Sequence, residues 1–260
     1  MIKTYHRPKT LEEALSLLAR PDTLPLGGGT LVNTPAFEAQ DFEVVDLQSL
    51  GLDQIQPVGH TLEIGATVSL QRLLDESGLP AGLLQAIRLE APLNLRNMAT
   101  VAGTLVAADG RSTFAAALLA MDAKVTVDGG PKTEDGLRSM VYGLGEFLPL
   151  RHELLKGRLI TQIAIPANVK FAFETVSRTP ADKPIVCAAL CQWPGGRARL
   201  ALGGWGKSPL LAMDGLEPDG VDAAARNAYH EASDDFASAA YRMDVAATLA
   251  KRCLAQITNE

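Results

Sequence analysis

The sequence predicts an α+β protein with two small N-terminal α/β subdomains and a separate C-terminal α+β domain. Two observations predict the N-terminal part: a glycine-rich loop follows a short apolar strand, and a second glycine-containing loop comes about 70 residues later. A third observation is the change of pattern after Pro166, where strands are followed by a helical tail, an order typical of a separate α+β domain. We therefore expect subdomains at about 1–55 and 56–166, and a C-terminal domain at 167–260.

The first subdomain opens with a helix signal. Thr10 and Glu13 form a capping box, and apolar residues recur at helical spacing from Leu11 to Leu18. Two short apolar segments, typical of buried strands, accompany this helix at 23–26 and 42–47.

The second subdomain begins with a strand–turn–strand pattern over 55–58 and 61–66. Helices are expected over 69–75, 81–89 and 112–121, a loop over 97–106, and a strand from Val125, and the segments 141–148 and 159–165 complete the region. In the C-terminal domain we expect strands over 171–176, 185–192 and 197–203, and two helices within 221–257.

Composition and charge exclude several classes of protein. With 47% hydrophobic and 21% charged residues, the 260-residue chain has the balance of a soluble globular protein. A formal net charge of −6 argues against nucleic acid or an anionic membrane as the main partner. No apolar run reaches the roughly 18 residues of a membrane helix, and the N-terminus lacks a signal-peptide pattern, so we expect a cytoplasmic protein.

The three cysteines do not predict a disulfide framework or a metal centre. Cys187, Cys191 and Cys253 are odd in number and unevenly spaced, and the first two lie in an apolar segment. A tetrahedral metal site or an iron–sulfur cluster needs four ligands. We expect buried, inert thiols and no metal site in this chain.

The first motif with chemical meaning is the loop from Pro25 to Leu31, with three consecutive glycines and Thr30. Glycines allow positive φ and let successive N–H groups converge on an anion, while Thr30 adds a hydroxyl. Neither a Walker lysine nor a G-x-G-x-x-G spacing is present, so a pyrophosphate is the ligand that we expect here. The alternative is a tight turn without a ligand.

The second motif runs from Arg96 to Thr104 and combines a glycine with hydroxyl side chains. Arg96 is a candidate to neutralise a phosphate or to pair with a carboxylate. Two such loops in successive subdomains indicate that both bind the same long ligand, a dinucleotide.

Several segments, in the same order along nearly the whole chain, resemble the FAD-binding (medium) subunits of molybdenum hydroxylases, such as the carbon monoxide dehydrogenase medium subunit and the xanthine dehydrogenase FAD subunit. The segments that carry the resemblance are Tyr5–Pro8 with Leu11–Leu15, Gly27–Leu31, Ile64–Leu70, Arg96–Thr104, Ala116–Ala123, Leu159–Pro166, the residues from Phe173 to Asp182, and Ala240–Leu254.

This resemblance implies a two-subdomain FAD-binding fold of the PCMH type, followed by a C-terminal domain like that of the carbon monoxide dehydrogenase flavoprotein. The first loop would hold the FAD pyrophosphate and the second would complete the grip, while Ile160 would pack on the cofactor and the loop at Asp182 would approach the isoalloxazine. The expected cofactor-binding residues are Leu26, Gly27, Gly28, Gly29, Thr30, Leu31, Thr100, Gly103, Thr104, Ile160, Asp182 and Lys183.

Four positions depart from the family pattern. Ala102 stands where the first glycine of a pair is usual, Thr104 replaces an Asn or Ser, and Gly110 replaces a proline. Thr113 stands where an Asp often contacts the ribityl chain; a threonine there still offers a hydroxyl for one hydrogen bond.

The expected function is electron transfer by a bound flavin, because the four scattered histidines form no catalytic arrangement with Ser, Cys or Asp. The resemblance implies a 2Fe-2S small subunit as electron donor, a molybdopterin large subunit that hydroxylates the substrate, and a dimer of heterotrimers. An alternative from another class is a flavin-free scaffold or assembly module of the same fold. A third interpretation, a self-standing flavin oxidase, requires a substrate pocket and a base that the sequence does not provide.

Overall fold

The computed structural model describes residues 1–32, 34, 37, 41–130 and 138–259. These residues form two compact units, each assembled from segments that are distant in the sequence. Unit 1 comprises 1–73, 93–107 and 124–164, and unit 2 comprises 74–92, 108–123 and 165–260. The domain boundaries expected at residues 55 and 166 stay a prediction. Among the described helices, none combines the length and the apolar character needed to cross a bilayer.

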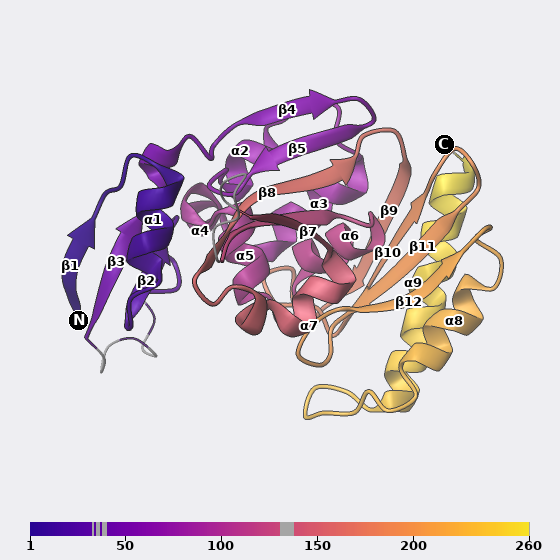
Figure 1. The fold of residues 1–260 in the computed structure, drawn as a ribbon. Helices are drawn as coiled ribbons and strands as arrows, with labels where there is room; N and C mark the ends of the chain where they lie inside the picture. The colour runs from indigo at the N-terminus through magenta and orange to yellow at the C-terminus, as the bar shows by residue number, and fades with distance from the viewer. Residues whose placement is uncertain (33, 35–36, 38–40, 131–137, 260) are drawn as a thin grey trace. The chain divides into compact units, whose positions relative to one another are not determined.

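The N-terminal part of unit 1 is a three-stranded parallel sheet covered by one helix (Figure 1). The helix α1 (Leu11–Leu18) begins where predicted, since the N–H of Glu13 donates to Thr10 Oγ1 at 3.2 Å. The strands lie in the order β1 (Ile2–His6), β3 (Phe42–Asp46) and β2 (Thr23–Leu26). The strand β1 was not expected, because its short polar-rich segment carries no alternating apolar pattern.

The second sheet of unit 1 has the strand order β4-β5-β8-β6-β7. Its strands are β4 (Ile55–Val58), β5 (Thr61–Gly65), β8 (Arg158–Pro166), β6 (Lys124–Gly129) and β7 (Ser139–Gly143). Short helices connect them: η2 (Gln48–Leu50), α2 (Leu70–Leu74), α4 (Leu93–Met98), α5 (Val101–Ala107) and α7 (Leu144–Leu154). The loop expected over 97–106 is therefore wrong for most of its length, since α5 occupies it.

Unit 2 is built on the four-stranded antiparallel sheet β12-β11-β10-β9. Its strands are β9 (Lys170–Val176), β10 (Val186–Gln192), β11 (Ala198–Gly203) and β12 (Leu210–Gly215), and its helices are α3 (Ala81–Glu90), α6 (Thr113–Ala120), α8 (Val221–Ala228) and α9 (Ala239–Asn259). The three strands and two final helices agree with the expected C-terminal pattern; β12 is an addition to it.

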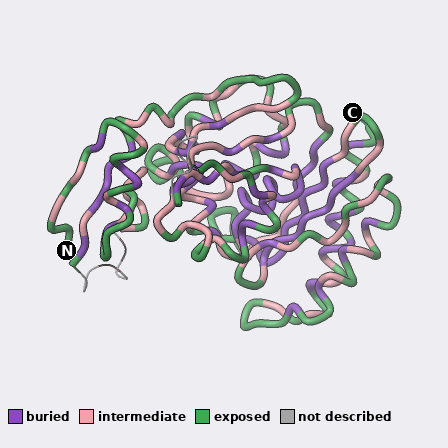
Figure 2. The backbone as a smooth tube through the Cα atoms, viewed as in Figure 1, coloured by how far each residue is buried: buried purple, intermediate pink, exposed green. Residues whose placement is uncertain are grey.

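The central strand β10 is buried from Val186 to Cys191, which shows that both faces of this sheet are covered (Figure 2). Cys187, Cys191 and Cys253 are all free and buried. Burial raises the pKa of the first two thiols to about 12, and it raises that of Cys253 as well. At neutral pH these side chains are protonated and behave as small apolar groups.

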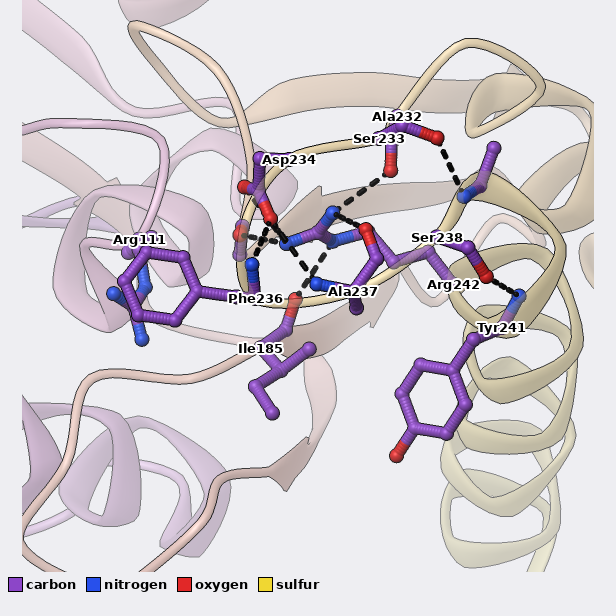
Figure 3. A network of polar contacts seen from close by, with 12 residues as sticks. Arg111, Ile185, Ala232, Ser233, Asp234, Phe236, Ala237, Ser238, Tyr241 and Arg242 are labelled. Atoms are coloured by element: carbon purple, nitrogen blue, oxygen red, sulfur yellow. Dashed lines mark hydrogen bonds and ion pairs between the residues drawn. The ribbon is translucent and has the colours of Figure 1, made fainter.

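Arg242, on α9, is fully buried and joins several segments of unit 2 (Figure 3). Its guanidinium donates to both oxygens of Asp234, at 2.8 and 2.9 Å. It also donates to the carbonyls of Ala232 and Ala237, both at 2.8 Å, and to that of Ile185 at 3.3 Å. Burial would raise the pKa of Asp234, but its hydrogen bonds, with Arg242 first, hold that pKa below its ordinary value.

Replacing Arg242 by Met should lower the free energy of unfolding by about 3 kcal/mol or more, because it leaves buried carbonyls without their donor and the Asp234 carboxylate without its charged partner. Chemical denaturation measures this loss. The matched control is Arg252→Met, on the exposed side of the same helix, where we expect a change within about 0.5 kcal/mol. Equal, small effects of the two substitutions would contradict this account of Arg242.

Candidate cofactor site

The first glycine loop begins at the end of β2. Leu26 is the last residue of that strand and pairs with Asp46 of β3, and the chain then enters Gly27 and Gly28. Gly29 has φ of +72°, a left-handed conformation that favours glycine. The loop thus turns away from the sheet at the point that the sequence predicts.

The second loop is formed by the start of α5. Thr100 caps this helix, since its Oγ1 accepts from the N–H of Gly103 at 3.0 Å. Thr104 lies inside the helix and its hydroxyl donates to the carbonyl of Thr100 at 2.8 Å. Ala102 also lies within α5, so its Cβ requires no unusual backbone conformation. The helix was missed because the glycine and the hydroxyl residues suggest a loop, whereas Thr100 acts as a cap.

The two loops are in direct contact. A Cβ atom built on Gly28 would lie 1.6 Å from the backbone oxygen of Met98, so only glycine allows this approach. A Cβ on Gly27 would lie 3.1 Å from Thr100 Oγ1. The two loops that the sequence predicts to bind one ligand therefore lie against each other, and the contact explains why glycine is needed at position 28.

The first loop carries backbone donors with no acceptor. Within the described part of the chain, the N–H groups of Gly27, Gly28 and Thr30 make no hydrogen bond. These residues are half-buried, and successive unpaired N–H groups in a glycine loop form a concavity that suits an anion. The residues present therefore fit the pyrophosphate of a dinucleotide.

A cavity of about 360 Å³ opens beside the two loops within unit 1. Gly27, Thr100 and Gly103 contribute from the loops, and most of the remaining wall is apolar. The apolar lining consists of Leu18, Leu24, Pro25, Leu31, Leu47, Ala66, Ala102, Val106, Leu155, Leu159 and Ile160. Three basic side chains also line it: His152, Lys156 and Arg158. The size and the character of this cavity suit a planar organic base with a charged substituent.

A second cavity of about 300 Å³ adjoins the same loops and is more polar. It shares Gly27, Thr67 and Thr100 with the first cavity, and Gly28 and Met98 also line it. The polar groups around it are Gln48, Asp53, Ser69, Arg72 and Asn97. A ligand with a pyrophosphate at the shared residues could extend into either cavity.

The residues predicted for the cofactor divide into two groups. Those in unit 1 lie together: Gly27, Leu31, Thr100, Gly103 and Ile160 line the first cavity. Leu26, Gly29, Thr30 and Thr104 adjoin these residues in the chain. The sequence did not point to Thr67 or to the basic group His152, Lys156 and Arg158 as site residues. Thr67 lies in a segment that resembles the family, whereas the basic residues carry no motif.

Asp182 and Lys183 lie in unit 2, and their side chains already have partners. Asp182 accepts from the N–H of Thr179 at 3.2 Å, and Lys183 Nζ lies 2.9 Å from Asp109 Oδ2. Arg111 holds the same loop by donating to the carbonyl of Lys183 at 2.6 Å. Arg96, in unit 1, donates to the amide oxygen of Gln71 at 3.1 Å.

Thr113, which stands where the family often has an Asp, uses its hydroxyl inside unit 2. Thr113 is buried, and its hydroxyl donates to the carbonyl of Ala86 at 2.8 Å. The carboxylate of Glu90 accepts from Ser112 Oγ and from the N–H of Phe114, both at 2.9 Å, so it covers the start of α6. The N–H groups at the start of α6 therefore have acceptors within unit 2.

The departure at Gly110 has a steric reason. A Cβ on this residue would lie 2.0 Å from the carbonyl oxygen of Trp205. The N–H of Gly110 donates to the carbonyl of Gly206 at 3.0 Å, and the N–H of Gly204 donates back to Gly110 at 2.6 Å. A proline at position 110 would clash with Trp205 and lose the first of these bonds.

Residues 1–168 match the family described as the FAD binding domain in molybdopterin dehydrogenase. The match covers more than half of the chain, and the chain therefore belongs to this oxidoreductase family, whose cofactor is FAD. The family identified from the sequence is confirmed.

Curated relatives extend the likeness over nearly the whole chain. The "Uncharacterized protein YgfM" of Escherichia coli K12 is 29% identical over 258 residues, which cover 96% of this chain and 94% of the relative. The glyceraldehyde dehydrogenase medium chain of Sulfolobus acidocaldarius is 28% identical over 227 residues, which cover 81% and 78% of the two chains.

Solved structures show the same fold. A chain of quinoline 2-oxidoreductase from Pseudomonas putida 86 aligns with a TM-score of 0.80 at 23% identity and covers 100% of this chain and 98% of its own. A chain of CO dehydrogenase from Oligotropha carboxidovorans aligns with a TM-score of 0.78 at 23% identity, with coverage of 100% and 99%. The predicted fold class is thus confirmed.

Replacing Gly28 by Ala should separate the two loops, because the added methyl group overlaps the backbone of Met98. We expect a loss of about 1–3 kcal/mol in the free energy of unfolding, measured by chemical denaturation, and weaker nucleotide binding, measured by calorimetry. The control is Gly195→Ala, where a Cβ meets no atom within 4 Å. Wild-type stability and affinity in the Gly28 variant would show that the loop contact is not required.

Proposed function

We propose that this chain is the FAD-binding, electron-transfer subunit of a molybdopterin-dependent hydroxylase or dehydrogenase. Electrons from an iron–sulfur small subunit would reach FAD and pass to an external acceptor, while a molybdopterin large subunit hydroxylates the substrate. A cytoplasmic location and a dimer of heterotrimers belong to the same proposal. Support comes from the family and from relatives that are a dehydrogenase medium chain and chains of molybdenum enzymes.

The observation that carries the proposal is the contact between the two loops, which presents unpaired N–H groups at Gly27, Gly28 and Thr30. These donors and the hydroxyl of Thr100 would hold the pyrophosphate. Leu31, Gly103 and Ile160 would contact the rest of the cofactor, because they line the adjoining cavity. Bound FAD would supply the redox chemistry, and the protein would supply binding and orientation.

The chain's own side chains support a carrier role. His6 pairs with Glu43 at 2.8 Å, and His230 contacts the carbonyl of Asn227 at 3.0 Å. His152 lines the first cavity but lies at its exposed margin. None of these three histidines forms a base–nucleophile pair with a described residue.

A flavin-free scaffold of the same fold is the second candidate function. The specific observation in its favour is that Thr113 is buried and bonded to Ala86, instead of being available to a ribityl chain. The two candidates differ in one property that can be measured directly, which is the uptake of FAD.

The full-length chain should take up FAD at about one per chain and absorb near about 450 nm. Gel filtration after incubation with FAD, followed by denaturation and flavin quantification, measures the ratio. Co-purification with a large molybdenum subunit and a small iron–sulfur subunit would distinguish a complex member from a lone oxidase. A colourless protein that also fails to bind added FAD would reject the proposed function and leave the scaffold.

A further inference from the structure

We infer that this chain recognises its nucleotide mainly through the ADP half, so that ADP-bearing nucleotides as a class, and not FAD alone, bind between its two loops. The inference rests on the proposed function, because it takes the loops to be the nucleotide site. It adds a specificity: a free ADP molecule should bind well, and a flavin without the ADP half should not.

The features of unit 1 match the chemical parts of ADP. The unpaired N–H groups of Gly27, Gly28 and Thr30 suit a pyrophosphate, and the adjoining cavity has an apolar wall suited to a base. Its volume of about 360 Å³ lies near the lower end of the usual range for ligand pockets, roughly 300–1,000 Å³, as expected for part of a dinucleotide.

The basic residues at this cavity are available to a negative ligand. Lys156 and His152 are exposed, and their side chains make no hydrogen bond or ion pair with the described residues. Among the described residues, the guanidinium of Arg158 has one weak contact, 3.8 Å from Met140 Sδ. The chain has a net charge of −6, so three uncompensated basic groups beside one cavity are a local exception to its composition. Phosphate is the group that such a cluster would attract.

The groups assigned by resemblance to the flavin half are, in contrast, already paired inside unit 2. Thr113 is bonded to Ala86, Lys183 forms an ion pair with Asp109, and Asp182 holds the N–H of Thr179. Thr113 could donate to a flavin only by giving up its bond to Ala86, so that exchange would add little affinity. Lys183 and Asp182 keep further donor and acceptor sites, but their present partners hold both side chains in unit 2.

The balance of these contacts sets the expected specificity. If the loops and the basic cavity provide most of the affinity, then ADP should bind within about tenfold of FAD, and FMN should bind at least about 100-fold more weakly than ADP. A site that gripped the flavin half would show the opposite order, with FMN competing and ADP ineffective.

The test is calorimetric titration of the full chain, freed of bound nucleotide, with ADP, FAD and FMN in turn. Lys156→Ala should weaken ADP binding about threefold to tenfold, because it removes one charge at the cavity. The matched control, Lys9→Ala, removes an exposed lysine outside both cavities and should leave ADP binding unchanged.

The outcomes separate this inference from the proposed function. Binding of FAD more than about tenfold tighter than ADP, or competition by FMN, would overturn the inference and leave FAD binding intact. An unchanged ADP affinity in Lys156→Ala would equally count against it. Binding of ADP without any binding of FAD would support the inference and reject the electron-transfer function. Failure of both ligands to bind would reject both.

Discussion

The approach of Gly28 to the backbone of Met98 is the constraint on which the site depends. It brings the loop after β2 against the turn between α4 and α5, two segments about 70 residues apart in the sequence. Because glycine has no Cβ, the two loops can pack closely, and residues of both loops line an apolar cavity and a polar cavity. Gly27 lines both cavities and Gly28 lines the polar one, so their unpaired N–H groups lie beside a space that suits an anion.

In unit 2, by contrast, the charged and polar groups form hydrogen bonds and ion pairs with one another. Arg242 is fully buried and supplies donors to Asp234 and to several carbonyls, while Glu90 covers the start of α6. The groups that could have served a cofactor there serve the fold instead. This contrast, free donors in unit 1 and paired groups in unit 2, is the physical basis for a site that favours the ADP half.

The sequence predicted the parts of the fold that have local signals. The capping box at Thr10, the glycine loop and three of the four strands of the C-terminal sheet were predicted from pattern alone. The strand β1 was missed because it gains its stability from pairing with β3, a contact that its own residues do not indicate. The basic group at Lys156 was missed for a similar reason: its importance comes from the cavity beside it, and not from its spacing.

The most direct test of the central claim is NMR of the full chain labelled with ¹⁵N-glycine and titrated with FAD. If the loop N–H groups bind the pyrophosphate, then the amide resonances of Gly27 and Gly28 should shift strongly and saturate together, whereas that of Gly195, which is distant in the sequence and lines neither cavity, should not move. Binding of FAD that leaves both loop resonances in place would contradict the account, because the cofactor would then be held elsewhere.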